Sequence, residues 1–357
     1  MQTQAQNKKD DHVRHALNFH KDKKPSHYDL IQFVHQVFSS TNVSDINIST
    51  YFGGHHFEAP FYINGMTGGT SLTKEYNEKL AILARETKLF IASGSVAVGV
   101  LEEASLDSFR ILRKMNPNGI IYANIGADKS LEQAKKAIEI VGADGLQIHV
   151  NLAQELVMPE GERVFNNWLD NIDAMVEAID LPITVKEVGF GMSKKALEAL
   201  TSIGVKTIDV AGKGGTDFAR IENARRPKWD KYNFIENFGN STSTSMLEAQ
   251  EYIHSHEILA SGGIRNSLDI VKMLALGARS VGMAGRMLNL VDNYSLEKAI
   301  DQVENWKKQI RSIMALLDAK NLAELQQTDL ILQGEVREWC ELRGIDYKQF
   351  ATRNERQ

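Results

Sequence analysis

The sequence has one cysteine, no apolar leader at its start and no long apolar run. Cys340 is the single cysteine among 357 residues, so the chain cannot form an internal disulfide. Residues 1–11 are polar and lack the apolar stretch of a secretory signal. No segment approaches the roughly 18 to 20 consecutive apolar residues that a membrane-spanning helix needs. We therefore expect a soluble protein of a reducing, cytoplasmic compartment that has no membrane partner.

The chain also lacks a strong excess of charge of either sign. Its 41 Lys and Arg residues and 46 Asp and Glu residues leave a formal net charge of −5. This balance offers no global electrostatic reason to bind nucleic acid, so any anionic ligand must be met by a local site. The 43% hydrophobic content is enough for one large domain or two ordinary ones.

What the sequence does have is an alternation of short apolar runs with longer amphipathic stretches from about residue 60 onward. The runs are apolar throughout, as in a parallel sheet that helices cover on its outer face. Eight such units in about 230 residues predict an α/β fold, the TIM (β/α)8 barrel. An open doubly wound sheet is the alternative, although no GxGxxG motif follows the first strand. The predicted strands are Phe61–Asn64, Leu89–Ser93, Ile120–Asn124, Leu146–Val150, Ile183–Val188, Thr207–Val210, Ile258–Ser261 and Ser280–Met283.

We expect a single domain with additions at both ends of a barrel core over residues 59–288. Residues 1–58 hold a charged N-terminal arm and a β-prone stretch, "SDINISTYFGGHHF", that could form a hairpin closing the barrel floor. Residues 289–357 are predicted helices that would pack outside the barrel or on another subunit. The connection over residues 212–244 is far longer than the usual 2 to 6 residues of a βα loop, which is typical of a lid or a binding element.

In a TIM barrel the active site lies at the C-terminal ends of the strands, so the segments after each strand carry the functional information. "SGGIRN" and "GMAGR", after the seventh and eighth strands, offer backbone N–H groups, helix N-termini, Arg265 and Arg286. This combination predicts a site for a monophosphate. Glycine serving only tight turns is the alternative for each single loop.

A phosphate in that position would place the rest of a ligand such as FMN across the barrel mouth. It would meet "MTG" at residues 66–68, Ser95, Asn124 and Lys186. Hydroxyl and amide groups can bond the edges of a ring, and Lys186 can stabilise negative charge. A Schiff-base role for Lys186 is the alternative.

The stretch "LQIHVNLAQELVMPEGERVF" begins as a buried strand and ends with His149, Asn151, Gln154 and Glu155. Since Mg²⁺ is often bound by one or two carboxylates together with substrate phosphates, Glu155 could be a metal ligand beside a diphosphate. A structural role explains Glu155 equally well, either in a network of polar groups that bond one another or at the start of a helix. The arm "NKKDDH" could be a solvated charge run, or it could fold over the mouth and bring basic groups to an anionic substrate.

Several of these segments together resemble one family. "NGMTGG", "QIHVNLAQELVMPEG", "KEVGFGMS", "GKGGT", "ASGGIR" and the leading "KKDDH" are similar to those of the type 2 isopentenyl diphosphate isomerases, which are FMN-dependent TIM-barrel enzymes. The resemblance extends from residue 8 to about residue 321, and "HVNLAQELVMPEG" followed by "KEVGFGMS" is its most specific part.

The resemblance implies a role for each matching position. The implied catalytic residues are Gln154, His149 and Lys186. The implied substrate contacts are Lys8, Lys9, His12, Ser95, Val96, Ala97, Asn151 and Gln154, and Glu155 is the implied Mg²⁺ ligand. The implied FMN contacts are Gly65, Met66, Thr67, Ser95, Asn124, Lys186, Ala211, Thr216, Gly262, Gly263, Arg265, Ala284 and Gly285.

The implied reaction, a step of isoprenoid biosynthesis, converts isopentenyl diphosphate to dimethylallyl diphosphate by moving a double bond. Reduced FMN would supply or accept a proton near N5, and NADPH or NADH would reduce the flavin. The resemblance also implies a homo-oligomer, a tetramer or an octamer. The chain departs from the family at Lys8, where Arg is frequent, and at Ala211, where Ser is common. We expect weaker diphosphate or flavin contacts there without loss of activity.

Two alternative functions stay open at this point. FMN-dependent α-hydroxy-acid oxidases resemble one another in a catalytic His within "HGG" after the sixth strand, whereas residues 213–215 here read "KGG". A non-catalytic flavin-binding barrel is the other alternative. Gln154, Glu155 and the basic arm argue against it, because a protein that only binds flavin needs no diphosphate site.

Overall fold

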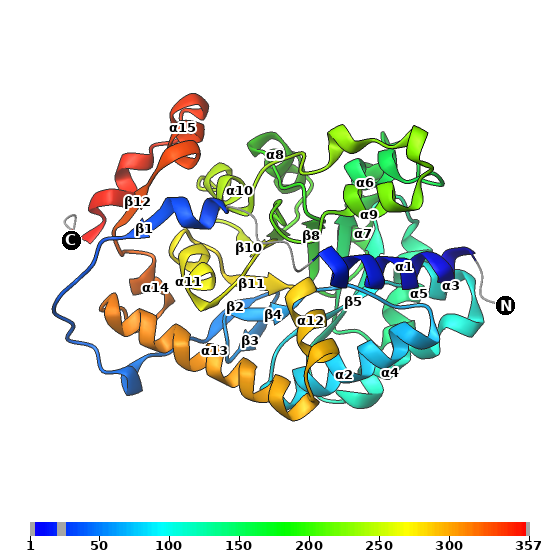
Figure 1. Cartoon of the computed structure of the whole chain (residues 1–357), viewed down its shortest axis with the longest axis horizontal. Coiled ribbons are helices and arrows are strands. Elements are labelled where there is room, and N and C mark those ends of the chain that lie inside the picture. The colour runs from blue at the N-terminus through cyan, green and yellow to red at the C-terminus, as the bar shows by residue number, and fades with distance from the viewer. Residues whose placement is uncertain (1–3, 20–25, 355–357) are drawn as a thin grey trace.

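The computed structural model describes residues 4–19 and 26–354 and contains a closed barrel of eight parallel strands (Figure 1). Neighbouring strands pair in chain order, and the last pairs with the first, Val281 opposite Phe61. The predicted TIM barrel and its eight strands are confirmed, and the open-sheet alternative is wrong. The strands are β4 (Phe61–Ile63), β5 (Ile91–Ser95), β6 (Ile121–Gly126), β7 (Gly145–Val150), β8 (Ile183–Glu187), β9 (Thr207–Asp209), β10 (Glu257–Ser261) and β11 (Ser280–Met283).

Helices surround the barrel, and local sequence signals set where several of them begin. Thr70 and Ser130 each cap a helix through a reciprocal pair of hydrogen bonds with the residue three positions on. Gly142, in the left-handed region, ends one of these helices. The surrounding helices are α2 (Ser71–Thr87), α4 (Asp107–Met115), α5 (Leu131–Val141), α7 (Trp168–Ala178), α8 (Lys194–Ser202), α10 (Thr242–Glu248), α11 (Ser267–Ala275) and α12 (Gly285–Asn293).

Shorter helices lie in the connections and at the surface. Three of them follow strands at the C-terminal end of the barrel: α3 (Ala97–Leu101), α6 (Leu152–Val157) and α9 (Phe218–Arg225). The long connection after β9 therefore contains a helix of its own. The 3₁₀ turns are η1 (His27–Leu30), η2 (Val43–Asp45), η3 (Glu103–Ser105), η4 (Lys228–Asp230), η5 (Asn233–Ile235) and η6 (Tyr347–Thr352).

The barrel floor is closed by the antiparallel hairpin β2 (Thr50–Phe52) and β3 (His55–Phe57), as predicted. Phe52 and Phe57 stack with ring centroids 4.4 Å apart, and both pack among the inward-facing aromatic side chains of Phe90 and Tyr122. The hairpin thus buries its apolar face in the bottom of the barrel. This leaves the opposite end for ligands.

The predicted charged arm is a helix, α1 (Gln4–Phe19), that lies at the C-terminal end of the barrel (Figure 1). It contacts α2, α9 and α12. Its buried residues His12, Val13 and Ala16 form one stripe at helical spacing, which explains why a mostly polar segment can dock.

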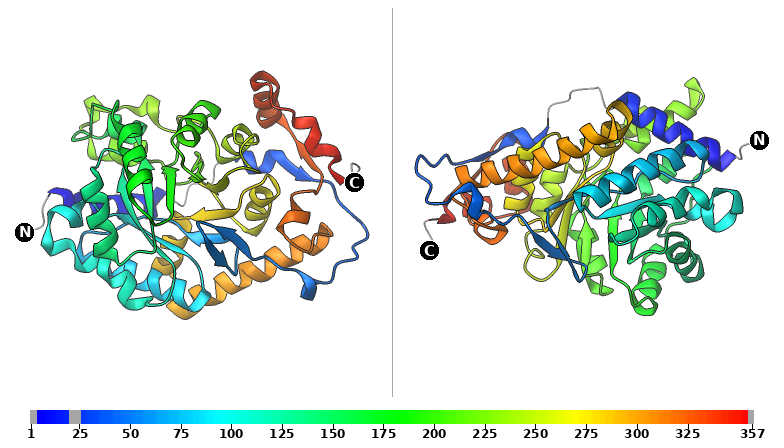
Figure 2. Two further views of the ribbon diagram at one scale, coloured as in Figure 1. Left: turned by 180° about the vertical axis from the view of Figure 1, so that it is seen from behind. Right: turned by 90° about the horizontal axis from the view of Figure 1, so that it is seen from below.

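The C-terminal segment packs on the outside of the barrel. Helix α13 (Leu296–Leu316) runs along α11 and α2 (Figure 2). It is followed by α14 (Leu322–Leu325), β12 (Leu330–Leu332) and α15 (Gly334–Arg343), and β12 pairs with β1 (Ile31–Phe33). No local pattern in the sequence predicts this pairing, because the two short strands lie about 300 residues apart in the chain. Within the described ranges, no helix is both long and apolar enough to cross a membrane.

Candidate active site

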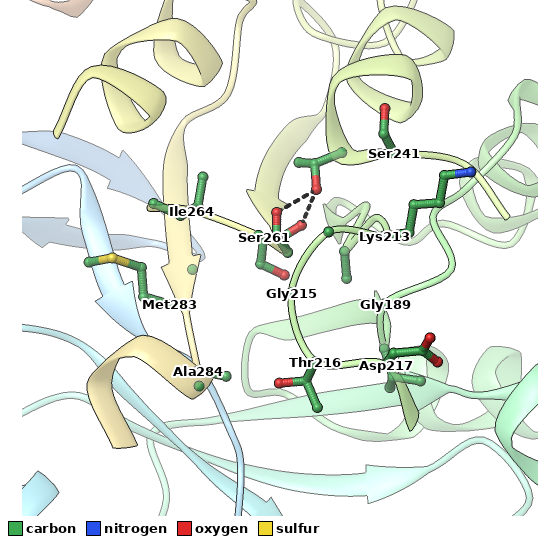
Figure 3. A pocket seen from close by; sticks show the side chains of 18 of the residues that line it. Gly189, Lys213, Gly215, Thr216, Asp217, Ser241, Ser261, Ile264, Met283 and Ala284 are labelled. Carbon is green, nitrogen blue, oxygen red and sulfur yellow. Dashed lines mark hydrogen bonds between the residues drawn. The ribbon is translucent and has the colours of Figure 1, made fainter. Parts of the chain in front are cut away.

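A cavity of about 1070 Å³ opens at the C-terminal ends of β8 to β11 and β4 (Figure 3). In Figure 3, Ile264, Met283 and Ala284 lie on one side of it, and Gly189, Lys213 and Asp217 lie on the other. Ten of the positions predicted for flavin contacts line it: Gly65, Met66, Lys186, Ala211, Thr216, Gly262, Gly263, Arg265, Ala284 and Gly285. Three others, Thr67, Ser95 and Asn124, are not part of its lining.

Glycine is required in the loop after β10 because that loop packs against the loop after β9. Gly262 and Gly263 have φ values of +104° and +75°, which side chains rarely adopt. A Cβ atom added to Gly263 would lie 2.7 Å from the carbonyl carbon of Gly214. The cavity wall is therefore bare backbone, and such a wall can bring N–H groups to a phosphate.

Arg265, which we predicted as a flavin contact, lines the cavity, and its guanidinium is hydrogen-bonded to two carboxylates. It donates to Asp29 at 2.6 and 2.9 Å and to Asp269 at 2.8 and 3.0 Å. Even its backbone N–H bonds Asp269. Arg265 therefore lies in the cavity wall, where a phosphate would have to share its donors with Asp29 and Asp269, and its flavin contact stays a prediction. Arg286, which lies over the Trp306 ring, lines the same cavity without an ion pair among the described residues.

The segment before the barrel supplies cavity residues that the sequence analysis missed. Tyr28 donates its hydroxyl to the carbonyl of Gly262 at 2.5 Å. His27 Nδ1 lies 2.8 Å from the Ser241 hydroxyl, and both residues line the cavity. No local pattern marks η1 as part of the site, because more than 200 residues separate it from its partners.

Lys186 is a buried cation in the cavity wall. Its Nζ donates to the carbonyl of Glu187 at 2.6 Å. Burial lowers the pKa of Lys186, and the carboxylates of Asp209 and Glu187 oppose that effect. Burial also raises the pKa of Glu187 to about 7, although backbone N–H groups of the following loop donate to its carboxylate. Asp209 accepts the backbone N–H of Ala211, whose φ of +33° is uncommon for a residue with a side chain.

Two buried hydroxyls bear on whether these residues fit FMN. Thr67 Oγ1 and Ser243 Oγ have no hydrogen-bond partner within the described part of the chain, and Ser243 lines the cavity. Buried polar atoms are normally satisfied, so unpaired hydroxyls here indicate a place for a ligand. The cavity volume, its bare backbone and the cation Lys186 all suit a phosphorylated, electron-accepting ring. The residues present therefore fit FMN.

A second cluster of functional groups lies between α1, α6 and α9. His12 Nε2 and Gln154 Nε2 each lie 2.9 Å from Oε1 of Glu222, and Arg225 donates to its Oε2 at 2.5 Å. Burial raises the pKa of Glu222, but the hydrogen bonds from His12 and Gln154 and the charge of Lys8 outweigh burial and lower it to about 2. The structure thus brings the predicted residues His12 and Gln154 together through Glu222, which the sequence analysis missed.

The predicted diphosphate and metal ligands lie beside this cluster. Lys9 Nζ lies 3.4 Å from the carbonyl of Ser95, and burial lowers the pKa of Lys9 to about 8. Lys8 Nζ contacts the sulfur of Met158 and lies 3.8 Å from Glu160. Lys8 pairs with Glu160 only at 3.8 Å and the hydrogen bond of Lys9 is to a backbone carbonyl, so both cations can turn to an anionic ligand.

Glu155 stands alone as a carboxylate at the predicted metal position. It accepts hydrogen bonds from Asn151 Nδ2 at 2.8 Å and from the backbone N–H of Glu162 at 2.7 Å. Within residues 4–19 and 26–354 no three His, Cys, Asp or Glu side chains are grouped to hold a metal ion. One partly exposed carboxylate fits Mg²⁺ only together with substrate phosphates and water.

Val96 and Ala97 are the weakest of the predicted substrate contacts. Val96 is fully buried, its N–H bonds the carbonyl of Asn124 at 2.8 Å, and its own carbonyl accepts from Val100. Val96 is thus already engaged by its neighbours in the fold, and the substrate contact predicted for it stays a prediction. Ala97 begins α3 and is only partly buried.

Comparison with known proteins bears on the identity of this site. The family model described as FMN-dependent dehydrogenase matches residues 108–332. The curated relative from Staphylococcus haemolyticus, named isopentenyl-diphosphate delta-isomerase, is 43% identical over 96% of this chain and 98% of its own. Relatives of the same name from Listeria innocua and Nocardia farcinica are 45% and 42% identical, over 97% and 98% of this chain and 97% and 96% of their own.

This chain belongs to the isopentenyl-diphosphate delta-isomerase family. Among solved structures, this isopentenyl-diphosphate delta-isomerase family member resembles a flavocytochrome b2 mutant with benzoylformate, with a TM-score of 0.64 at 20% identity over 85% of this chain and 76% of that one. It also resembles a mandelate oxidase mutant, with a TM-score of 0.62 at 13% identity over 91% of both chains. These likenesses show a shared barrel fold.

Proposed function

We propose that this chain converts isopentenyl diphosphate to dimethylallyl diphosphate, with FMN in the cavity at β8 to β11 and Mg²⁺ at Glu155. One juxtaposition carries the proposal. The glycine-lined cavity with Lys186 in its wall adjoins a buried polar cluster that contains Gln154 and receives basic residues from α1. A flavin binder without a second, diphosphate-binding substrate would not need that cluster.

At the diphosphate end, Lys8 and Lys9 would bind the phosphate oxygens. Lys8 would exchange its distant contact with Glu160 for the ligand. Glu155, whose orientation Asn151 and the N–H of Glu162 already fix, would hold Mg²⁺, which would offset negative charge on the diphosphate. This binding energy would fix the hydrocarbon end against the flavin.

At the hydrocarbon end, Gln154 is held by its hydrogen bond to Glu222. When bound and reduced, FMN would supply an electron-rich ring with a proton-exchanging nitrogen next to the alkene. Lys186 would stabilise the negative charge of that ring, since its Nζ has only one hydrogen-bond acceptor among the described residues. His149 would orient the alkene or relay a proton.

The remaining parts of the proposal depend on the family resemblance and the composition. NADPH or NADH would reduce the flavin without being consumed in each turnover. The chain would work in the cytoplasm as a homo-oligomer, either a tetramer or an octamer.

The test is an anaerobic assay of the purified, photoreduced protein with labelled isopentenyl diphosphate and Mg²⁺. We expect labelled dimethylallyl diphosphate, and we expect Gln154→Ala and Glu155→Gln to retain FMN but lose isomerisation. Glu162→Gln is the matched control, because only the backbone of Glu162 contacts Glu155. Full activity in both Gln154→Ala and Glu155→Gln would show that the site is misplaced.

The same protein, reoxidised, should be given glycolate and lactate with oxygen. Lys213 stands where α-hydroxy-acid oxidases resemble one another in a catalytic His, so we expect no oxygen consumption. Turnover of either acid would favour the oxidase alternative.

A further inference from the structure

A continuous chain of side-chain hydrogen bonds crosses the barrel interior beneath the site. Asn64 Nδ2 donates to Asp209 at 2.9 Å, and Gln147 Nε2 donates to Asn64 Oδ1 at 3.2 Å. Asn124 Nδ2 donates to Gln147 Oε1 at 3.0 Å, and Asn124 Oδ1 lies 2.9 Å from His149 Nδ1. This chain of hydrogen bonds therefore links the buried carboxylate of Asp209 on β9 to the imidazole of His149 on β7.

The direction of every bond in this chain is set at the Asp209 end. Asp209 is fully buried and also accepts hydrogen bonds from Tyr62, Ser261 and the N–H of Ala211. With Asn64, these donors use both oxygens of Asp209 as acceptors, and Lys186 lies opposite it on β8.

Each amide in the chain has one donating end and one accepting end. Asn64 must therefore turn its nitrogen to Asp209, which leaves its oxygen for Gln147. Gln147 in turn presents its oxygen to Asn124, and Asn124 presents its oxygen to His149. An oxygen facing Nδ1 requires a proton on Nδ1.

We propose that Asp209 is a positioning residue that acts through Asn64, Gln147 and Asn124 to hold His149 in the Nδ1–H tautomer. The ring is neutral, because burial and the charges of Lys186, Lys9, Lys129 and Lys8 lower the pKa of His149 to about 3. Its Nε2 lies beside Gly126 at the C-terminal end of β6 and has no hydrogen-bond partner among the described residues. Nε2 is therefore an acceptor.

The consequence for catalysis rests on the proposed function. In this tautomer the imidazole can receive a hydrogen bond or a proton from a ligand at Nε2, but it has no proton at Nε2 to donate. This excludes His149 as the acid that protonates the alkene and leaves it as an acceptor beside the reacting groups.

The experiment is ¹⁵N NMR of the purified protein labelled at histidine, without substrate, with His149→Gln to identify the His149 signals. We expect a protonated Nδ1 and an unprotonated Nε2 at pH 7. Gln147→Met interrupts the chain of hydrogen bonds at its middle without altering His149 itself. It should therefore produce the Nε2–H tautomer beside the Nδ1–H tautomer. Gln147→Glu keeps an oxygen toward Asn124 and should retain the Nδ1–H form. Ser261→Ala removes a donor to Asp209 that lies outside the chain and should also retain it.

A wild-type spectrum with Nε2 protonated would overturn the proposal without any variant. An unchanged tautomer in Gln147→Met, with a native thermal unfolding transition, would overturn the role of the chain. Because the measurement uses no substrate, either result leaves the isomerase proposal standing. An inactive enzyme with the expected tautomer would count against the isomerase proposal alone.

Discussion

The two halves of the barrel mouth differ in how open they are to a ligand. The cofactor half, at the ends of β8 to β11 and β4, is glycine-rich backbone around an open cavity. The half that we propose binds the substrate, here called the substrate half, is formed by α1, α6 and α9. It is closed by ion pairs among its own side chains, with Glu222 and Glu160 both bound to Arg225. A ligand enters the first half without rearrangement, whereas an anionic ligand in the second must replace existing charge contacts. Separate variants should therefore affect the two halves independently.

The largest effect should come from filling the cofactor half. Gly263→Val places a side chain on a left-handed residue against Gly214, and strain plus overpacking should cost about 3 kcal/mol or more. FMN affinity, measured by fluorescence titration, should fall by more than about a hundredfold. Gly344→Val is the control, since Gly344 has φ of +67° with open space around it. Equal FMN affinity in both variants would contradict the cavity assignment.

Next in size should be the loss of the buried cation in the cofactor half, Lys186. Lys186→Met should lower kcat for isomerisation by about 10²- to 10³-fold while FMN stays bound, because negative charge on the ring loses its partner. Lys307→Met is a matched control, since Lys307 is a buried lysine that bonds the carbonyl of Thr87 far from the mouth. A small loss of kcat in Lys186→Met would argue against charge stabilisation by Lys186.

A smaller effect is expected in the substrate half. Glu222→Gln should lower kcat/KM by about ten- to a hundredfold, with FMN binding unchanged, because His12, Gln154 and Arg225 lose their common anchor. Glu160→Gln, at the exposed edge of the same cluster, is the control. A loss of FMN in Glu222→Gln would show that the halves are not independent.

The same carboxylate should shape acid stability. Since the pKa of Glu222 is about 2 when folded and near 4.5 otherwise, its stabilisation is present above pH 4.5 and is lost as the pH falls toward 2. The free energy of unfolding in urea should therefore fall over this pH range more steeply for the wild type than for Glu222→Gln. Parallel curves would contradict the low pKa.

A final comparison, which concerns stability and not activity, separates two carboxylates that pair with one arginine of the cofactor half, Arg265. Asp29 is 56% exposed at its side chain, so Asp29→Asn should lower the free energy of unfolding by less than about 1 kcal/mol. Asp269 is almost fully buried, and Asp269→Asn should lower it by about 3 kcal/mol or more. Similar losses of unfolding free energy in the two variants would mean that burial does not determine how much each ion pair stabilises the fold.

Much of this molecule follows from local sequence. The eight strands were predictable because each is a short apolar run bounded by a helical pattern, and the cavity glycines because they directly follow strands. His149 and Lys186 were predicted for the same reason, and they lie near the C-terminal ends of β7 and β8, whereas Gln154 lies in α6. Their catalytic roles stay predictions. Arg265 was predicted for the same reason, but its ion pair with Asp29, which lies 236 positions away, was not.

Other functional residues had no local signal. Glu222 lies inside a long connection and Asp209 at the end of a short strand, and neither belongs to a spacing pattern. The pairing of β1 with β12 joins opposite ends of the chain. Such contacts depend on chain segments that meet only when the barrel closes.

The sequence by itself determined the barrel, the glycine wall and the set of polar groups at the strand ends, because each depends on interactions between residues near one another in the chain. Only the tertiary structure decided which of those groups are paired, which are free and which way each hydrogen bond points. The physical reason is that a buried donor or acceptor takes its role from the groups packed against it, and in a closed barrel those groups come from distant strands.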